Sequence, residues 1–600
     1  MLPLIQINNL TVDFPGTGNT VPALQDVTFS LNRGEMLAVV GESGSGKSVM
    51  FLTIMNLLSK AARIVRGSVM FSTDGKNDCN LLGMPDNILR SNRGSHMAMI
   101  FQEPMTSLNP LMSCGEQVCE PLMLHKKFSR SEARTAVLKL FEKVLLPEPE
   151  LIYNNYPHRL SGGQKQRVMI AMAISCNPSL LICDEPTTAL DVRVQKTILD
   201  LLKSLRRSEN MGIIFITHDL GLVADMADRA LVMLRGKIVE EGNVKDIFSR
   251  PQHPYTRGLL MCRPALHLKG ERLPVVSDFL ENAEKVSDKI ITDPYSNSNL
   301  HIGENPAKFS SSELPEPNEA KRKMKPHDLS GTNRTVLLEV KGVDLRYSSG
   351  KNWLGKEKHW VHAIRDINFK VYQGETLGLV GESGSGKTTL GRALLGLNKP
   401  LHGNITYGGS DLMRMSNAEI LEFRRNIQIV FQDPYSSLNP RLMIGPAISE
   451  PLQVHNAFGA SERKTQVMEI LKKVNLQPEH FYRYPHAFSG GQRQRIVIAR
   501  ALILNPGFVV FDESVSALDV SVQAQILNLI NDLKKNLGFT AVFISHDLSV
   551  IRYLCDRVIV MEKGRIVESG EVESVYKNPQ TGYTRSLIEA IPGINLLRKG

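Results

Sequence analysis

Two glycine-rich octapeptides are the part of this chain whose residue types most directly imply chemistry. GESGSGKS covers residues 41–48, and GESGSGKT covers residues 381–388. Each follows an apolar run and precedes a helical pattern, the setting that the GxxxxGK[ST] motif requires. In that motif, backbone N–H groups surround a phosphate, the lysine bridges the outer phosphates and the Ser or Thr hydroxyl faces Mg²⁺. The sequence predicts two nucleotide sites with these loop ligands: Gly41, Ser43, Gly44, Gly46, Lys47, Ser48, Gly381, Ser383, Gly384, Gly386, Lys387 and Thr388.

An Asp-Glu pair ends an apolar run in each half and supplies candidates for metal binding and base catalysis. Asp184 precedes Glu185, and Asp512 precedes Glu513. The aspartate is placed to hold Mg²⁺ through water, and the glutamate can polarise the attacking water as a general base. A bare Asp-Glu after a strand is often only a solvated strand end. The upstream phosphate loop favours the catalytic interpretation.

A third motif, SGGQ, lies between the phosphate loop and the acidic pair of each half. Its residues are Ser161, Gly162, Gly163 and Gln164, then Ser489, Gly490, Gly491 and Gln492. A serine followed by two glycines at the start of a helix forms a second phosphate cradle. A nucleotide already held in its own loop does not need that cradle, so the motif indicates a phosphate bound elsewhere.

The three motifs in this order resemble the ATP-binding cassette (ABC) ATPases, for which SGGQ is the signature. The resemblance implies that the signature of one cassette closes over the γ-phosphate of ATP bound to the other cassette. Two cassettes facing head to tail then enclose two ATP molecules with Mg²⁺, which explains why one chain carries each motif twice. Both halves keep the glutamate and the signature serine, so two hydrolytic sites are expected.

The same resemblance implies further site residues by position. They are the Q-loop glutamines Gln102 and Gln432, the switch histidines His218 and His546, the D-loop aspartates Asp191 and Asp519, and the adenine-stacking aromatics Phe14 and Tyr347. The predicted Mg²⁺ ligands are Ser48, Gln102, Asp184, Thr388, Gln432 and Asp512. Glu185, His218, Glu513 and His546 are the predicted catalytic residues. One departure lies beside the second base, where Ser514 replaces the proline found at Pro186.

The order of the elements predicts an α/β fold with two tandem cassettes. Buried parallel strands alternate with helical patterns, and amphipathic stretches such as SEARTAVLKLFEKVLL and SERKTQVMEILKKVNL indicate a helical insertion in each half. The resemblance implies that each is a P-loop NTPase domain, with a RecA-like parallel-sheet core and an antiparallel β subdomain. We expect cassettes at 1–263 and 336–600, joined by a flexible Pro- and Ser-rich linker at 264–335.

Composition narrows the class of protein. The chain has 600 residues, 42% of them hydrophobic, and a formal net charge of +10, which suits an anionic lipid surface or a nucleic acid. No apolar run approaches the roughly 18 residues of a membrane span, and the start of the chain lacks the features of an export signal. Seven cysteines without a CxxC pair indicate a reduced, cytosolic chain.

Three kinds of ABC protein compete: an importer ATPase, a translation-associated protein and a DNA-repair protein. The second expects a long charged helical linker and the third expects CxxC pairs, and neither is found. FQEPMTSLNPLMSCGEQV, FQDPYSSLNPRLMIGPAI, RPQHPYTRGLL and NPQTGYTRSLI resemble the dipeptide, oligopeptide, nickel and glutathione importers. The resemblance implies two membrane permease subunits, an extracytoplasmic substrate-binding protein, no nucleic acid, and a peripheral position on the cytoplasmic face of the bacterial inner membrane. Peptide, glutathione and nickel chelate all stay open as cargo.

Overall fold

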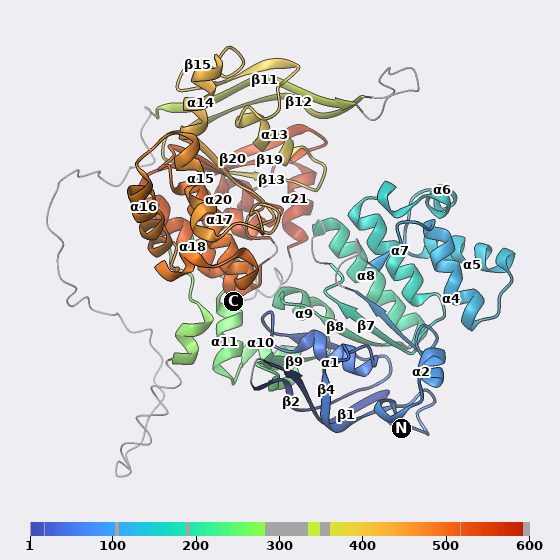
Figure 1. The fold of residues 1–600 in the computed structure, drawn as a ribbon. Helices are drawn as coiled ribbons and strands as arrows, with labels where there is room; N and C mark the ends of the chain where they lie inside the picture. The colour runs from blue at the N-terminus through green and yellow to red at the C-terminus, as the bar shows by residue number, and fades with distance from the viewer. Residues whose placement is uncertain are drawn as a thin grey trace, which may run out of the picture.

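Two halves of the same design make up the chain (Figure 1). The computed structural model describes residues 2–16, 19–101, 107–187, 192–281, 334–348, 360–516 and 518–591. Two predicted site residues, Gln102 and Asp191, lie outside these described residues. Each half contains a six-stranded sheet, a four-stranded sheet and helices, so the predicted tandem α/β fold is confirmed.

The first half is built on a sheet of order β10-β9-β3-β8-β7-β6, parallel except at β10. Its strands are β3 (Met36–Val40), β6 (Met97–Ile100), β7 (Leu180–Asp184), β8 (Gly212–Ile216), β9 (Arg229–Leu234) and β10 (Lys237–Asn243). A second, antiparallel sheet has the order β2-β1-β4-β5. It comprises β1 (Ile5–Pro15), β2 (Thr20–Leu31), β4 (Arg63–Phe71) and β5 (Cys79–Asn80).

The second half repeats this plan. Its six-stranded sheet has the order β16-β17-β18-β13-β19-β20, and its four-stranded sheet the order β12-β11-β14-β15. The strands are β11 (Val336–Ser348), β12 (Trp360–Tyr372), β13 (Thr376–Val380), β14 (His402–Tyr407), β15 (Ser410–Asp411), β16 (Ile427–Val430), β17 (Phe508–Asp512), β18 (Thr540–Ile544), β19 (Arg557–Glu562) and β20 (Arg565–Glu571).

Continuous apolar runs in the central strands arise because each strand contributes to two cores. Successive side chains of a strand point to opposite faces of the sheet. Ile182 and Ile214 enter the core shared with the four-stranded sheet, whereas Leu181 and Ile213 enter the core shared with the helices. Burial on both faces holds the strand ends, where the acidic pairs lie, in fixed positions.

Helices of the first half are α1 (Lys47–Ile54), α2 (Asp86–Asn92), α4 (Cys114–His125), α5 (Arg130–Lys143), α6 (Pro149–Asn154), α7 (Gly162–Ile174), α8 (Val192–Glu209), α9 (Leu220–Met226), α10 (Val244–Ser249) and α11 (Pro254–Met261), with short 3₁₀ turns η1 (Leu81–Gly83), η2 (Pro157–Arg159) and η3 (Pro264–Leu266). Those of the second half are α13 (Lys387–Leu394), α14 (Asn417–Asn426), α15 (Ile444–Val454), α16 (Ala460–Lys473), α17 (Gly490–Leu502), α18 (Val520–Leu537), α19 (Leu548–Leu554), α20 (Val572–Lys577) and α21 (Gly582–Glu589), with η4 (Pro478–Tyr482) and η5 (Pro485–Ala487). No helix in the described ranges has the length and apolar composition of a membrane span.

The predicted amphipathic helices of the insertions are confirmed as α5 and α16. Ala133, Val137 and Phe141 of α5 are buried, as are Val467 and Leu471 of α16. Spacings of three and four residues put these side chains on one helix face. Ser129 caps the start of α5, where its hydroxyl and the carboxylate of Glu132 satisfy each other's backbone N–H groups.

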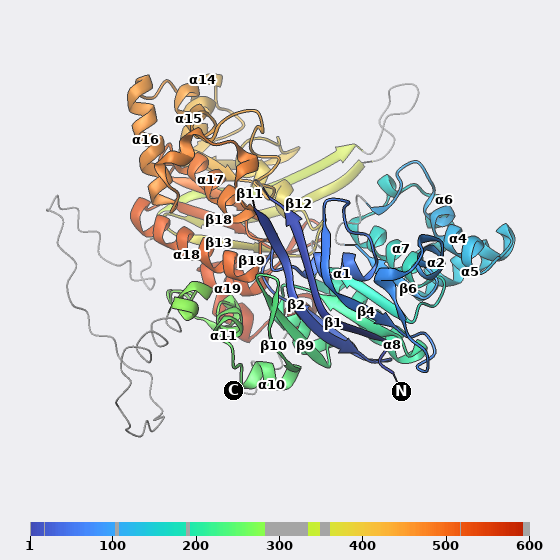
Figure 2. The ribbon, with the colours of Figure 1, turned by 60° about the horizontal axis from the view of Figure 1, so that its bottom comes forward.

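Residues 264–281, the start of the predicted linker, form an ordered segment that packs against the second half. We call this stretch the connecting segment. In Figures 1 and 2, α11 just before it lies beside α18 of the other half. Asn528 of α18 accepts from the N–H of Leu273 at 3.0 Å and donates to its carbonyl at 2.8 Å. The Tyr553 hydroxyl donates to the Glu271 carbonyl at 2.7 Å. The linker interpretation therefore has no support before residue 282, and residues 282–333 lie outside the described residues.

Changing Asn528 to Ala tests whether this packing joins the halves in solution. The variant leaves the buried N–H and carbonyl of Leu273 without their partner, which costs about 1–3 kcal/mol per group. We expect the Leu273 amide to exchange its hydrogen at least tenfold faster than in the parent protein. Hydrogen exchange followed by mass spectrometry measures this, and Asn536→Ala, at an exposed position of the same helix, is the control. Equal protection of residues 268–276 in parent and Asn528→Ala would show that the contact does not hold the segment.

Candidate functional site

Both phosphate loops adopt a shape that depends on glycine. Each loop follows a buried strand, β3 or β13, and each leads into a helix whose first residue is the motif lysine. Gly46 has φ of +102°, and a Cβ at that position would lie 2.7 Å from the Ala23 carbonyl oxygen. Gly386 has φ of +101°, with the corresponding distance to Ala363 only 2.4 Å. A side chain cannot be accommodated there, so the loop keeps its backbone N–H groups exposed for an anion.

The motif lysines are buried and held by carbonyl oxygens of their own loops. Lys47 Nζ donates to the carbonyls of Gly41 at 2.7 Å and Glu42 at 2.8 Å. Lys387 Nζ repeats this with Gly381 at 2.7 Å and Glu382 at 2.9 Å. Burial lowers the pKa of Lys47, and the nearby carboxylates, Asp519 of the other half foremost, partly offset that effect. Each site therefore presents a fixed ammonium group beside the phosphate loop.

The hydroxyl and carboxylate predicted to hold Mg²⁺ lie together in both halves. Ser48 Oγ donates to Asp184 Oδ2 at 3.4 Å, and Thr388 Oγ1 donates to Asp512 Oδ1 at 3.1 Å. Burial, followed by the charge of Glu185, raises the pKa of Asp184 to about 6. Burial likewise raises the pKa of Asp512. Hydroxyl and carboxylate oxygens are the ligands that a hard divalent cation prefers. A nearby cation would also favour the charged form of these buried carboxylates. The residues therefore fit Mg²⁺.

The predicted catalytic glutamates pair with the predicted switch histidines. His218 Nδ1 lies 3.1 Å from Glu185 Oε1, and His546 Nδ1 lies 3.4 Å from Glu513 Oε2. Burial alone lowers the pKa of His218, but the hydrogen bond and charge of Glu185 outweigh it, so the net shift is upward. The same holds for His546 beside Glu513. Burial opposes ionisation of Glu513, yet His546 brings its pKa below the usual value.

Both glutamates have a left-handed backbone, which is uncommon for a residue with a side chain. Glu185 has φ of +46° and Glu513 has φ of +45°. Such conformations cost about 1–3 kcal/mol, so the surrounding structure has to hold them. The second glutamate has one more partner, because Gln432 Nε2 donates to Glu513 Oε2 at 3.0 Å. Gln432 thus contacts the predicted base of the second half, whereas its counterpart Gln102 lies outside the described residues.

The SGGQ motifs form the starts of α7 and α17. The Ser161 hydroxyl accepts from the Gln164 N–H at 3.3 Å, and the Ser489 hydroxyl accepts from the Gln492 N–H at 3.3 Å. Gly162 and Gly490 face open space, whereas a Cβ on Gly163 would meet Val194 at 2.9 Å and one on Gly491 would meet Val522 at 2.3 Å. The first glycine leaves room at the helix N-terminus, and the second allows close packing on the next helix. Sequence reasoning missed this packing role.

The predicted adenine-stacking residues lie on corresponding strands, β1 and β11. Phe14 is partly buried against the core of the first half. Tyr347 is 45% exposed, and its hydroxyl accepts from Asn398 Nδ2 at 2.8 Å. Their contact with adenine stays a prediction.

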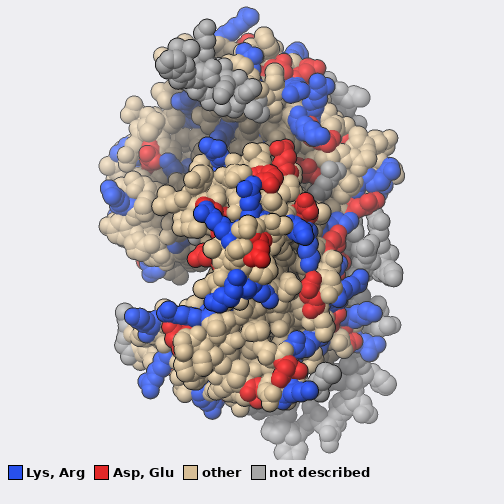
Figure 3. All heavy atoms as spheres, turned by 90° about the vertical axis from the view of Figure 1, so that its right-hand side faces the viewer, with Lys and Arg blue, Asp and Glu red and all other residues tan. Residues whose placement is uncertain are grey.

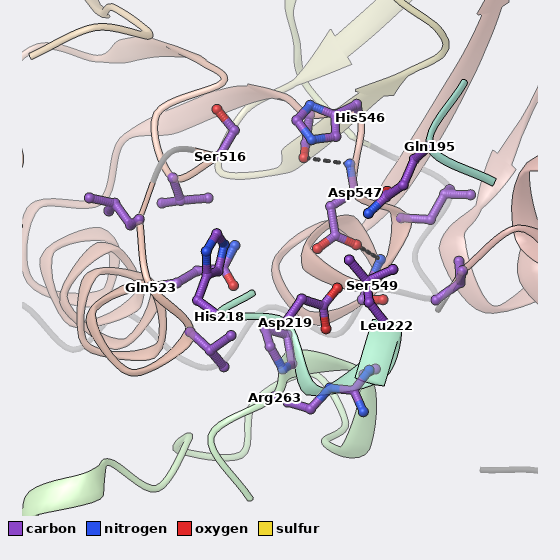
Figure 4. Close-up of a pocket in the computed structure, with 18 of the residues that line it drawn as sticks. Gln195, His218, Asp219, Leu222, Arg263, Ser516, Gln523, His546, Asp547 and Ser549 are labelled. Atoms are coloured by element: carbon purple, nitrogen blue, oxygen red, sulfur yellow. Dashed lines mark hydrogen bonds between the residues drawn. The ribbon is translucent and has the colours of Figure 1, made fainter. Parts of the chain in front are cut away.

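The two halves meet at the first phosphate loop. The backbone N–H of Ser43 donates to Asp519 Oδ2 of the second half at 2.9 Å. A cavity of about 160 Å³ lies between the halves, and Figure 4 shows His218 and His546 among the side chains around it. Asp519 occupies the position predicted for the D-loop, whereas its counterpart Asp191 lies outside the described residues. The contact joins a residue that follows the acidic pair of one half to the phosphate loop of the other half.

Two phosphate loops, each with an acidic pair and a histidine, define a nucleotide-hydrolysing protein built from two ATPase cassettes. The ABC transporter model matches residues 24–188 and 364–516, and the model for the oligopeptide/dipeptide transporter C-terminal region matches residues 239–288 and 567–599. The chain belongs to the ABC transporter family, as the sequence motifs predicted, and it is an ATPase.

Curated proteins of similar length are similar in sequence to this chain over almost its whole length. The glutathione import ATP-binding protein GsiA of Pectobacterium atrosepticum is 44% identical, covering 99% of this chain and 90% of that protein. GsiA of Escherichia coli (strain K12) is 44% identical, covering 98% and 89%. A solved dimeric ATP-binding cassette in a post-hydrolysis state, bound to ADP and Pi, is 29% identical with a TM-score of 0.36, covering 39% of this chain and 99% of that chain.

Changing Asp184 to Asn should stabilise the nucleotide-free protein in a pH-dependent way. The native carboxyl keeps its proton up to a pKa of about 6, whereas an unfolded Asp releases it near pH 4. Between these values the native state binds more protons, so wild-type stability decreases as pH rises through that window. Thermal unfolding in EDTA should show a stability gain of about 2–3 kcal/mol for the variant at pH 7, falling to about 1 kcal/mol at pH 4.5. A constant difference across this range would contradict the assigned pKa.

Proposed function

We propose that this chain is the ATP-hydrolysing subunit of a membrane importer for glutathione or related small peptides. The observation that carries the two-site part of the proposal is the Asp519 carboxylate on the Ser43 N–H, because it brings the second cassette against the first nucleotide loop. The cargo class is supported by the names of the relatives, which are similar from end to end. The expected partners are two permease subunits and an extracytoplasmic binding protein. The expected place is the cytoplasmic face of the inner membrane.

Each cassette is proposed to contribute its own phosphate loop and the partner's signature to a composite site. Ser489 and Gly490 at the start of α17 would close on the ATP held by the first loop, and Ser161 and Gly162 on that held by the second. Helix N-termini favour anions because their first N–H groups are unpaired and the helix dipole is positive there. Closure would then depend on ATP, since its phosphates interact with both halves only in the closed pair.

Within a site, the chain's own residues would divide the chemistry as follows. Mg²⁺-ATP supplies the phosphoryl group and, through the metal, charge neutralisation. Ser48 and Asp184 would hold the metal, and Lys47 would stabilise negative charge on the outer phosphates. Glu185 would take a proton from the attacking water, while His218 holds one carboxylate oxygen and fixes its direction. The second site uses the corresponding residues, with Gln432 on the base as well.

A partly apolar groove beside the second site is suited to a permease segment. Tyr435 is 62% exposed and Leu442 is 40% exposed, and both line a hollow next to α15 together with Arg500 and Glu450. Along the chain, β16 is followed by Gln432 and then by the groove residues from Tyr435 onward. Because Gln432 contacts Glu513, a segment bound in the groove could respond to the state of the catalytic site. A soluble partner such as RNA has less support. On the face drawn in Figure 3, Lys and Arg are interspersed with Asp and Glu rather than gathered into one basic field.

Glutamine at the two proposed bases tests the hydrolytic mechanism. Each of Glu185→Gln and Glu513→Gln keeps the shape of the side chain but removes proton acceptance. The double variant should therefore lose about 10² to 10⁴ in ATPase rate. ATP binding should persist, as measured with a fluorescent analogue on the full chain. Glu150→Gln, on the exposed surface of α6, is the control. Wild-type turnover by the double variant would remove these residues from the mechanism.

A charged residue in the groove tests the membrane partner. Leu442→Asp places a carboxylate on an apolar docking surface, so recovery of permease subunits with the tagged chain from detergent extracts should fall at least tenfold. ATP binding by the isolated chain should stay unchanged. Leu421→Asp, an exposed leucine on α14, is the matched control. Full recovery with Leu442→Asp, or stimulation of ATPase activity by RNA with no membrane partner, would argue against the importer assignment.

A further inference from the structure

In each half, a tyrosine that follows the last strand of the sheet in sequence forms a hydrogen bond with the phosphate loop. Tyr255 of α11 is fully buried, and its hydroxyl accepts from the backbone N–H of Glu42 at 2.9 Å. Tyr583 of α21 is 8% exposed, and its hydroxyl accepts from the N–H of Glu382 at 3.1 Å. The two halves make the same contact, although the two residues before the tyrosine differ, His-Pro in the first half and Thr-Gly in the second.

The hydrogen-bonded N–H belongs to a peptide unit that also holds the motif lysine. The N–H of Glu42 and the carbonyl of Gly41 are the two ends of one planar amide. That carbonyl accepts from Lys47 Nζ at 2.7 Å, and in the second half the Gly381 carbonyl accepts from Lys387 Nζ at 2.7 Å. The amide is therefore fixed from both sides, by a neutral hydroxyl on its N–H and by an ammonium group on its oxygen.

The position of the tyrosine is itself set by a half-buried glutamate and a helix cap. Glu240 of β10 accepts from the N–H groups of Gln252 at 2.8 Å and His253 at 3.0 Å. His253 Nδ1 then accepts from the Tyr255 N–H at 3.1 Å. This chain of hydrogen bonds fixes the start of α11 on the last strand of the sheet, so the tyrosine ring enters the core directly below the phosphate loop.

The second half reaches the same placement with different residues. Glu568 of β20 accepts from the N–H groups of Gln580 at 2.8 Å and Thr581 at 3.1 Å. Thr581 replaces the histidine as the cap, and its hydroxyl accepts from the Thr584 N–H at 3.1 Å. The change from His-Pro to Thr-Gly therefore alters the cap but not the contact made by Tyr583. The hydroxyl contact with the loop is the feature that both halves keep.

We propose that Tyr255 and Tyr583 are positioning residues that hold each phosphate loop ready for ATP by fixing the first peptide unit of the loop. Without the hydroxyl, the N–H of Glu42 loses its acceptor, and the amide can rotate away from the orientation that places its carbonyl on Lys47. A loop that must be ordered at the moment of binding has a lower affinity for its ligand. This role explains why a C-terminal element follows each cassette. It rests on the proposed assignment of the two loops as ATP sites.

Tyr255→Phe in the full chain is the test, because it removes one oxygen and keeps the buried ring. Lys387→Ala is added first to weaken binding at the second loop, so that a fluorescent ATP analogue reports mainly on the first. We expect Tyr255→Phe to weaken binding at the first loop about three- to tenfold, the size of one lost hydrogen bond. In the reciprocal background, Lys47→Ala, Tyr583→Phe should weaken the second loop by a similar factor, and Tyr255→Phe should leave it unchanged.

Tyr153→Phe is the matched control, since its hydroxyl is also buried and lies 3.4 Å from Cys119 Sγ in the helical insertion. Its affinity for ATP should equal that of the parent. Unchanged affinity in Tyr255→Phe overturns the inference, and so does an equal loss in Tyr153→Phe or at both loops together. Wild-type binding by the Lys47→Ala and Lys387→Ala double variant overturns the ATP-site assignment as well, which separates the two failures.

Discussion

The hydrogen bond between the Ser43 backbone and the Asp519 carboxylate is the interaction that relates the two halves at the site. It joins a loop that has to present N–H groups to an anion with an acidic group of the other half. The carboxylate accepts from one of those N–H groups, so a phosphate in the loop would have to compete with it or share the loop. The connecting segment makes a second contact with the second half, where Asn528 satisfies both backbone groups of Leu273.

Around this contact, the catalytic groups form a buried cluster of charges that only partly balance. Lys47, Asp184 and Glu185 lie within one electrostatic neighbourhood, and burial moves the pKa of Lys47 down and that of Asp184 up. The charge of the adjacent Glu185 further disfavours ionisation of Asp184. A metal cation bearing phosphate would relieve this conflict.

Much of the site could be predicted from the sequence because its residues lie in short, contiguous motifs. The octapeptides, the acidic pairs and the histidines are each local patterns, and buried strands on both sides place them at one sheet edge. The contact of Tyr255 with Glu42 could not be predicted in this way, since it joins positions 213 residues apart and depends on how α11 packs. The visible signal was the repeated YTR after each cassette. Residues 264–281 were misjudged for a related reason. Their prolines and polar residues indicate a linker, but a few apolar anchors such as Leu273 fit a surface provided by the other half.

The two proposed catalytic glutamates have the same backbone conformation although the residue after them differs between the halves. Glu185 precedes Pro186, and a residue before proline is restricted to extended conformations, so its left-handed φ of +46° is held against two preferences. Glu513 precedes Ser514, which removes the second restriction, yet its φ is +45°. The serine brings a cost of its own, because its hydroxyl is buried and has no hydrogen-bond partner among the described residues. Two different neighbours thus accompany one backbone geometry at the glutamate. The neighbouring strand is the feature that both halves share, because the glutamate N–H donates to the carbonyl of Ile216 in the first half and of Ile544 in the second, each at 3.0 Å.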